Sequence, residues 1–476
     1  MTKEIGSVMP FRYVEIENAP ALKKENVRMV AVYYPYTEDA GAFKCSDEKI
    51  NAVWELCRHT IQATSFGGVF VDGDRERLPY EADAYINQLG WYACTDDITL
   101  ARYSHEYLIL NPTWPTEWIL FSVLMAWEDY WYTGDKASLQ VFYEDLKAKA
   151  LMGLRREDGL ISTTKPPVTV EIMAAAHYTK KKPFTDIVDW PHCESDGYQK
   201  EAFNTVVNAF HARALNQLSE LATVIGKEDD AKMFKDAAAK TIQSMNSKLI
   251  DSTKGIYFDG EGATHSALHA NMFPLAFGLV PPERKGAVTQ FIKSRGMACS
   301  VYGAQFLLEA LFENGEAQHA LSLMTADGDR SWTHMIERVG STMCLEAWDI
   351  KYKSNLDWNH AWGAAPANIL PRKVLGIEPA EPGFAKIKIQ PRLGNLTWAE
   401  GKVTTVRGPV SVKIQNEKNS FSMTFEIPKK TTAAIIVPKR GEGRLMLDGK
   451  EVKGVETGLD LLIDHLESGK HEVRMF

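Results

Sequence analysis

Apolar residues recur at helical spacing along most of the chain between residues 46 and 376. The first helix is predicted to begin at Ser46 to Lys49, which resembles a capping box. The apolar residues that follow fall on one face of it: Ile50, Val53, Trp54, Cys57 and Ile61. The same periodicity predicts further helices near residues 97–108, 114–133, 137–152, 199–225, 229–249, 282–294, 299–313, 315–325 and 360–375.

This pattern amounts to roughly ten to twelve helices, which is more than a small bundle holds. Many of them are apolar over more than half of their circumference, as expected for helices that are packed on two sides. We therefore predict a mainly α fold in which inner and outer helices pair as an (α/α)6 toroid. No repeat of fixed period is present, which argues against a solenoid.

Strand patterns flank the helical region on both sides. Residues 13–17 and 27–34 are rich in β-branched residues and partly alternate, which predicts a short N-terminal β segment, the remnant of a β-domain. After Gly376 the alternation returns at 386–390, 410–414 and 420–425, which predicts a C-terminal antiparallel β-sandwich. The expected boundaries are: 1–45 for the β segment and linker, 46–376 for the helical domain and 377–476 for the sandwich.

Composition excludes several classes of function. The net charge of -8 argues against nucleic acid as a partner, because that role requires a basic surface. The apolar runs are too short to span a membrane, and the N-terminus has no apolar core of a signal peptide. As written, the chain is expected in the cytoplasm, and in the periplasm or outside the cell if its N-terminus is truncated.

Cysteine and tryptophan usage bears on the chemistry. The 6 cysteines are scattered, without a CxxC pair or a histidine at ligand spacing, so we expect buried thiols and neither a metal nor a cofactor. All 12 tryptophans lie between Trp54 and Trp398. Flat rings stack on the apolar faces of sugars, although core packing explains most tryptophans equally well.

An acidic segment between residues 71 and 83 is the first candidate for catalysis. It holds five carboxylates and two arginines beside loop-forming glycine and proline. A carboxylate among like charges has a raised pKa, as a general acid requires, and an arginine there can hold carboxylates or sugar hydroxyls. A solvated loop with salt bridges is the alternative. The candidates in this segment are Asp72, Arg75, Glu76, Tyr80 and Asp83.

A second candidate segment surrounds Glu346, an acid in an apolar stretch that also contains Trp348. An unpaired charge there would be costly, so Glu346 is either functional or paired with an arginine. His360 follows between two tryptophans, which suits a sugar hydroxyl, although a core histidine is the commoner case. Trp114 and Trp190 sit in proline-containing loops, where side chains often line a site.

The order of these segments resembles glycoside hydrolase family 78, the α-L-rhamnosidases. Residues 76–83 (ERLPYEAD) match the second half of that family's acidic signature in spacing. Residues 342–348 (TMCLEAW) and 359–364 (NHAWGA) are similar to its Thr-Met-Trp-Glu-Arg-Trp and Asn-His-Tyr-Ala-Phe-Gly-Ala segments. The chain departs from the family at several positions: Pro79 for Gly, Tyr80 for Trp, Leu345 for Trp and Ala347 for Arg.

The resemblance implies hydrolysis of rhamnosides with inversion, without a metal. Glu76 then acts as general acid and Glu346 as general base, facing each other across one pocket at a mouth of the toroid. The expected sugar contacts are Asp72, Arg75, Tyr80, Asp83, Trp114, Trp190, Trp348 and His360.

Two other functions remain open for the same fold. An unsaturated-uronyl hydrolase or polysaccharide lyase acts on acidic sugars and should present a cationic pocket, whereas the candidate site here is rich in carboxylates. A catalytically inactive carbohydrate-binding relative would keep the aromatic residues, although retention of both Glu76 and Glu346 counts against it. The aglycone, the linkage and a homodimeric state are left open.

Overall fold

The computed structural model describes residues 11, 13–440 and 443–476. Six inner helices form a closed ring in which each helix contacts the next and the last contacts the first. In ring order they are α2 (Glu81–Cys94), α4 (Thr116–Thr133), α7 (Thr205–Val224), α9 (Leu268–Ala276), α11 (Gly303–Glu313) and α14 (Pro366–Ile369). A π-helical turn, Leu370–Val374, continues the last of them.

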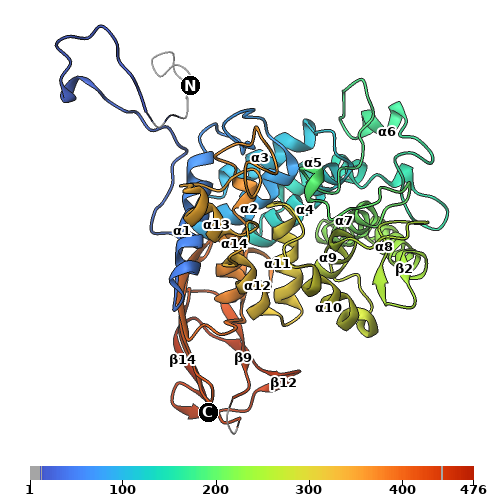
Figure 1. Ribbon diagram of the computed structural model, residues 1–476. Helices are drawn as coiled ribbons and strands as arrows, with labels where there is room; N and C mark the ends of the chain where they lie inside the picture. Colours follow the sequence, from blue (N-terminus) through green and yellow to red (C-terminus); the bar gives the residue numbers. More distant parts are fainter. Residues whose placement is uncertain (1–10, 12, 441–442) are drawn as a thin grey trace.

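An outer layer of helices covers this ring (Figure 1). It consists of α1 (Glu48–Thr64), α3 (Thr99–Leu110), α5 (Ala137–Lys149), α8 (Glu228–Lys248), α10 (Lys285–Arg295) and α12 (Ala317–Met324). Two shorter helices lie outside this scheme, α6 (Val170–Ala175) and α13 (Trp332–His334). The predicted (α/α)6 toroid is confirmed.

Aromatic rings fill the axis of the toroid. Phe210 lies 4.9 Å from Phe121 and 5.0 Å from Phe273, and Phe273 lies 4.8 Å from Phe306. Tyr85 stacks on Phe306 at 6.1 Å. Because these five rings come from five different inner helices, the toroid has a packed centre, and a ligand can enter it only as a pocket at one mouth.

Two inner helices escaped prediction. All 14 residues of α2 are buried, including Glu81, Asp83, Asn87 and Gln88, so its sequence has no apolar face to reveal a helix. Helix α9 is short, has the polar His269 and Asn271 among its buried residues, and contains Pro274. Polar residues are buried in both helices, so neither shows the separation of apolar and polar faces on which helical periodicity depends.

The C-terminal region forms the predicted sandwich. One sheet contains β1 (Ala42–Cys45), β6 (Trp398–Thr405), β7 (Gly408–Asn416), β8 (Phe421–Ile427), β14 (Gly469–Met475), β10 (Leu445–Leu447) and β11 (Lys450–Glu451), in that order. The other contains β12 (Val455–Thr457), β13 (Asp460–Leu466), β9 (Thr432–Pro438), β5 (Lys386–Ile389) and β4 (Ile377–Pro379). All neighbours within these two sheets are antiparallel except β5 and β9. A separate hairpin in the helical region joins β2 (Ile250–Asp251) and β3 (Ile256–Tyr257).

The N-terminal strands were predicted at the wrong residues. Residues 13–34 form no strand, contain only the short 3-10 helix Lys24–Asn26, and extend away from the rest of the molecule (Figure 1). The first strand among the described residues is β1, which pairs with β6 of the sandwich. Alternating β-branched residues form a strand only where a neighbouring strand supplies backbone hydrogen bonds. In the described chain, residues 13–34 pair with no strand, although Tyr34 N–H donates to the Ser65 carbonyl at 2.6 Å.

A tight junction connects the toroid to the sandwich. Gln390 N–H donates to the Gly376 carbonyl at 3.0 Å, and a Cβ at residue 376 would lie 2.2 Å from the Gln390 carbonyl carbon. Gly376 also has a φ of +79°, so only glycine fits where the chain passes from helix to strand.

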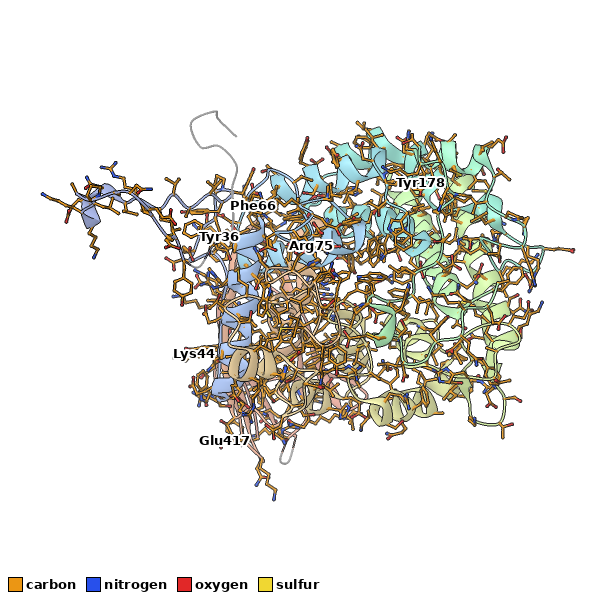
Figure 2. All side chains as sticks on the ribbon, turned by 45° about the horizontal axis from the view of Figure 1, so that its top comes forward. Tyr36, Lys44, Phe66, Arg75, Tyr178 and Glu417 are labelled. Carbon is orange, nitrogen blue, oxygen red and sulfur yellow. The ribbon has the colours of Figure 1, made fainter. Side chains whose placement is uncertain are left out.

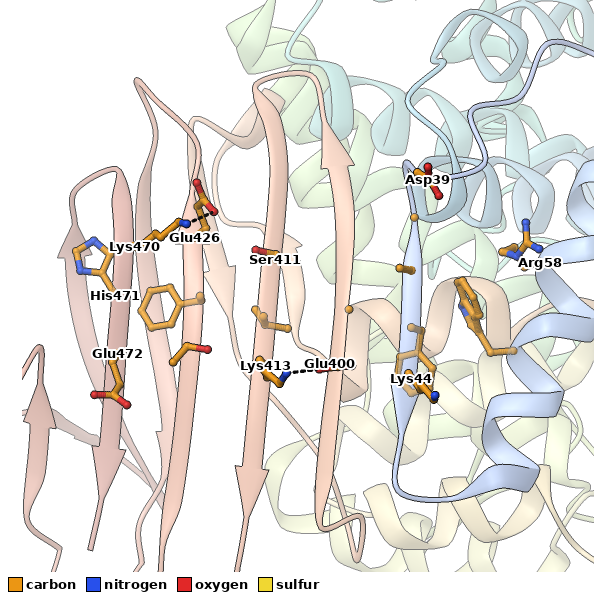
Figure 3. Close-up of a pocket in the computed structure, with 18 of the residues that line it drawn as sticks. Asp39, Lys44, Arg58, Glu400, Ser411, Lys413, Glu426, Lys470, His471 and Glu472 are labelled. Carbon is orange, nitrogen blue, oxygen red and sulfur yellow. Dashed lines mark ion pairs between the residues drawn. The ribbon is translucent and has the colours of Figure 1, made fainter.

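A cavity of about 1020 Å³ lies on the outer face of the larger sheet, beside α1 (Figure 3). Its strand residues neutralise one another: Lys413 pairs with Glu400 at 3.0 Å and Lys470 with Glu426 at 3.9 Å. None of the predicted site residues lines this cavity.

Among the described residues, no helix is long and apolar enough to cross a membrane. All six cysteines are free thiols, as expected, but Cys193 is exposed while the other five are buried.

Candidate active site

The acidic loop at residues 71–83 is held by hydrogen bonds within itself and by contacts to the distant segment 357–360. Leu78 N–H donates to the Asp72 carboxylate at 2.9 Å, and Asp72 N–H donates to the Leu78 carbonyl at 2.9 Å. Gly73 forms a β-bridge with His360. A Cβ at Gly73 would lie 2.5 Å from Asp357 Oδ2, so glycine is what permits the loop to approach residues 357–360 this closely.

The segment that carries Glu346 is held by the same region. His360 N–H donates to the Cys344 carbonyl at 3.0 Å and Glu346 N–H to the Asp357 carbonyl at 3.1 Å. In return, Asp357 N–H donates to Glu346 Oε2 at 2.9 Å. Two loops separated by about 270 residues in the sequence are therefore fastened together through residues 357–360.

One pocket of about 530 Å³ gathers nine of the ten predicted site residues. They are Asp72, Arg75, Glu76, Tyr80, Asp83, Trp114, Trp190, Glu346 and His360. The pocket lies at a mouth of the toroid, where α2 begins, and its size suits a small ligand. Arg75, labelled near the middle of the view in Figure 2, marks its position.

A single arginine connects the two glutamates. The Arg75 guanidinium donates to Glu76 Oε1 at 2.7 Å and lies 3.5 Å from Glu346 Oε2. Lys353 adds a second cation 3.1 Å from the same oxygen of Glu346. Glu346 is 4% exposed, so these two cations balance a buried charge. Glu76 is far more open, with 35% of its side chain exposed.

The sequence suggested a raised pKa for the general acid, Glu76, but the structure gives it a lowered one. Burial raises the pKa of Glu76, but hydrogen bonds from Tyr80, at 2.8 Å, and from Arg75 lower it more, so that it lies below its usual range. The raised values belong to its neighbours. Burial and the charge of Asp83 raise the pKa of Asp72 to about 7, and burial and Asp357 raise that of Asp74 to about 6.

His360 is a buried cation between two carboxylates. Its Nε2 lies 2.7 Å from Asp83 Oδ1 and its Nδ1 lies 3.5 Å from Asp357 Oδ2. Burial lowers the pKa of His360, but Asp357 and Asp83 raise it more, to about 10. Glu346, Asp357 and His360 have the spacing of a metal site. Contacts within the protein already engage this cluster, since His360 Nε2 faces Asp83 at 2.7 Å and Arg75 and Lys353 both contact Glu346.

Tryptophans form the opposite wall. Trp114 is held because Thr113 N–H donates to the buried carboxylate of Glu81 at 2.9 Å. Trp114 is 40% exposed and lies 6.5 Å from Trp118, which packs edge-on against Tyr80 at 5.5 Å. Trp190 is half-buried and lines the pocket from a loop, as predicted.

Trp348 was assigned wrongly. It is fully buried, donates from its indole N–H to the Cys299 carbonyl at 2.8 Å, and packs edge-on against Trp332 at 4.9 Å. Glu346 and Trp348 are two residues apart in an irregular segment, where no fixed period indicates which side chains share a face. Trp348 therefore anchors the segment in the core.

Sequence reasoning missed other residues of this pocket. Trp118 lies one helical turn after Trp114, and that spacing could have indicated a shared face. Trp362 also lines the pocket. Lys353 forms an ion pair with Glu346, and Asp357 forms one with His360. The two charged residues stand in the short stretch between Glu346 and His360, where charges need partners.

A closed ring of six inner helices with an outer helical layer, and with acids and tryptophans at one mouth, is the fold of a six-hairpin carbohydrate-active domain. Comparison with known proteins agrees. The family model of the bacterial α-L-rhamnosidase six-hairpin glycosidase domain matches residues 38–374, and that of the bacterial α-L-rhamnosidase C-terminal domain matches residues 376–451. The chain belongs to the bacterial α-L-rhamnosidase family.

Its relatives are distant and longer. An α-L-rhamnosidase of Formosa agariphila is 22% identical over 490 residues, which cover 92% of this chain and 49% of that protein. One of Streptomyces avermitilis is 25% identical over 243 residues, 49% of this chain and 23% of that protein. The chain thus spans half or less of the length of these relatives.

Solved structures show the same fold. The α-L-rhamnosidase from Dictyoglumus thermophilum superimposes with a TM-score of 0.76 at 21% identity, over 93% of this chain and 51% of that one. The Streptomyces avermitilis α-L-rhamnosidase, solved in complex with L-rhamnose, gives a TM-score of 0.73 at 17% identity, over 93% of this chain and 42% of that one.

Proposed function

We propose that this chain removes terminal α-L-rhamnose from glycosides or polysaccharides by hydrolysis with inversion. The observation that carries the proposal is the contact of one arginine, Arg75, with both Glu76 and Glu346 in a pocket walled by tryptophan. Membership of the α-L-rhamnosidase family supports the choice of sugar.

The contacts of Arg75 set an upper limit on the separation of the two glutamates. The terminal nitrogens of a guanidinium are about 2.3 Å apart, so the two carboxylate oxygens held by Arg75 are at most roughly 8.5 Å from each other. Inverting glycosidases place their carboxyls about 6.5–9.5 Å apart, which leaves room for a water molecule. The proposal therefore requires the two carboxyls to lie between about 6.5 Å and this upper limit.

In this proposal Glu76 is the acid and Glu346 the base. Protonated Glu76 transfers its proton to the glycosidic oxygen as the bond from that oxygen to C1 breaks. Glu346 accepts a proton from a water molecule, whose oxygen bonds to C1 from the opposite face and yields the β anomer. The lowered pKa of Glu76 means that its carboxyl is ionised before the sugar binds. In this proposal the bound sugar excludes water from the pocket, and the loss of water around the Glu76 carboxyl raises its pKa.

The charge of the pocket favours a neutral sugar over a uronate. Both mobile cations in it, Arg75 and Lys353, are engaged with Glu346, and His360 is enclosed by Asp83 and Asp357. Asp72 is left as a hydrogen-bond partner for sugar hydroxyls. An unsaturated-uronyl hydrolase would need an uncommitted cation at this position.

An aryl α-L-rhamnoside tests the proposal. We expect turnover, with a loss of at least about a hundredfold in kcat for Glu76→Gln and for Glu346→Gln. Proton NMR of the first-formed sugar should show the β anomer. Initial release of the α anomer would exclude inversion, and turnover of an unsaturated uronide without turnover of the rhamnoside would favour the uronyl hydrolase. Binding of rhamnose without turnover would favour the inactive relative.

A further inference from the structure

A second cavity, the distal cavity, lies at the opposite end of the toroid from the catalytic pocket. Its volume is about 510 Å³, and it lies where the toroid meets the sandwich, because Glu378 of β4 and Lys388 of β5 line it. Helix α4 borders both spaces: Trp118 near its start lines the catalytic pocket, and Trp131 near its end lines the distal cavity. At a rise of about 1.5 Å per residue, these two tryptophans are about 20 Å apart along the helix. Among the described residues the two spaces share no lining side chain, so the distal cavity is a separate space.

Most charged groups of the distal cavity neutralise one another. Six of the nine charged residues that line it form ion pairs among themselves: Arg372 with Glu309, Lys373 with Glu313 and Glu378, and Lys388 with Glu378. These are three cations and three acids, so together they carry no net charge. Glu128, Arg213 and Lys285 remain, and none of these three forms an ion pair within the described chain.

Glu128 is a buried acid without a cation in contact. Its side chain is almost entirely enclosed, since the residue is only 5% exposed. Within the described chain, its one side-chain hydrogen bond comes from the Tyr85 hydroxyl at 3.5 Å, which is the limit for such a bond. Burial raises the pKa of Glu128 to about 7. A buried carboxyl with so few partners is costly, and a ligand in the cavity can supply the missing hydrogen bonds.

Arg213 also lacks a polar partner. The residue is half-buried, and among the described residues its guanidinium forms neither an ion pair nor a hydrogen bond. The guanidinium carbon lies over the Trp127 ring, 5.3 Å from its centroid. A guanidinium that lies on an aromatic ring keeps the N–H groups at its edge available, so Arg213 can donate to a ligand in the distal cavity.

Two tryptophans give the distal cavity an aromatic wall. Trp127 and Trp131 are one helical turn apart on α4, and their ring centroids lie 5.0 Å apart. Both are half-buried, so part of each ring is accessible. The indole N–H of Trp127 donates to Glu220 at 2.6 Å, which fixes that ring in place. Such rings offer a flat apolar surface to a ligand that also carries polar groups.

We propose that the distal cavity binds an uncharged sugar. One ligand that satisfies both Glu128 and Arg213 must offer donors and acceptors together, and every hydroxyl is both. An ionic ligand is repelled by one of these two charges, whereas a neutral ligand is repelled by neither. Lys285 is exposed, so water and salt screen its charge. The volume suits one or two sugar rings, and the apolar face of a ring can stack on the tryptophans.

Fluorine NMR of protein that contains 5-fluorotryptophan observes the two spaces separately. Trp131 reports on the distal cavity and Trp114 on the catalytic pocket, and Trp131→Phe and Trp114→Phe identify the two signals. At pH 8, where Glu128 is ionised, we expect L-rhamnose and D-glucose each to shift the Trp131 signal until it saturates. D-glucuronate, which has the ring of glucose and a negative charge, should require at least about fivefold higher concentration.

Two variants test the groups that carry the proposal. Arg213→Gln should raise the Kd for D-glucose at the Trp131 signal at least about fivefold and leave the response of Trp114 to L-rhamnose unchanged. Glu128→Gln keeps the shape of the side chain and should remove most of the preference for glucose over glucuronate. Arg338→Gln is the matched control, because Arg338 is exposed and lines neither space. Thermal unfolding checks that each variant is folded.

Three results would overturn the proposal. They are a Trp131 signal that neither neutral sugar shifts by about 100 mM, tighter binding of glucuronate than of glucose, and equal binding of glucose by wild type and folded Arg213→Gln. None of them bears on the proposed function, because turnover of an aryl rhamnoside and the Trp114 signal report on the catalytic pocket. Absence of turnover would in turn leave the distal cavity to be judged by Trp131 alone.

Discussion

His360 provides a test of how the buried charges hold the site together. Its raised pKa, about 10 against a usual value of 6.5, means that the folded protein binds the proton more tightly than the unfolded chain. The stability that follows is complete below pH 6.5 and is lost as pH rises toward 10. A difference of this size corresponds to about 4–5 kcal/mol at most, comparable to the cost of breaking a buried ion pair.

The perturbation is His360→Gln, which keeps a hydrogen-bond donor for Asp83 and removes the charge. We expect the free energy of unfolding of this variant to be several kcal/mol lower than that of the wild type at pH 6.5. This difference in free energy should become smaller by pH 10. Urea unfolding at each pH measures it.

A buried neutral histidine gives the matched control. Burial lowers the pKa of His105 to about 3, so any cost of His105→Gln should not vary between pH 6.5 and 10. A gap between wild type and His360→Gln that stays constant over this range would refute the assignment of His360 as an imidazolium. Loss of activity without loss of stability would show that His360 serves the sugar alone.

Other changes test the site more narrowly. Tyr80→Phe removes a hydrogen bond that lowers the pKa of Glu76, so the alkaline limb of kcat/KM against pH should move to higher pH, and a shift to lower pH would contradict Glu76 as the acid. Gly73→Ala pushes a methyl against Asp357 and should cost about 1–3 kcal/mol in urea unfolding and at least about tenfold in kcat. Trp348→Ala should destabilise the fold by about 3–5 kcal/mol, and the enzyme that remains folded should have a normal KM. A raised KM without loss of stability would instead show that Trp348 contacts the substrate.

The site was partly readable from the sequence because its residues occur in dense local clusters. Glu76 stands among other acids and arginines, and Glu346 stands in an apolar stretch, and both features reflect the cost of charge near a core. The resemblance to the rhamnosidases, which the family models confirm, supplied the order of the segments. Lys353 has no such signature, because a single lysine in a loop looks like any solvated charge.

The sequence by itself determined the class of fold and the elements with one wet face, since helical and strand periodicities record which side of an element meets water. The outer helices and the strands at β5, β7 and β8 were predicted on this basis. Tertiary structure alone decided the rest. It buried α2 on all sides, placed β1 beside β6, and turned Trp348 into the core. It also set the pKa values of Glu76 and His360, because these depend on partners that folding brings together from distant parts of the chain.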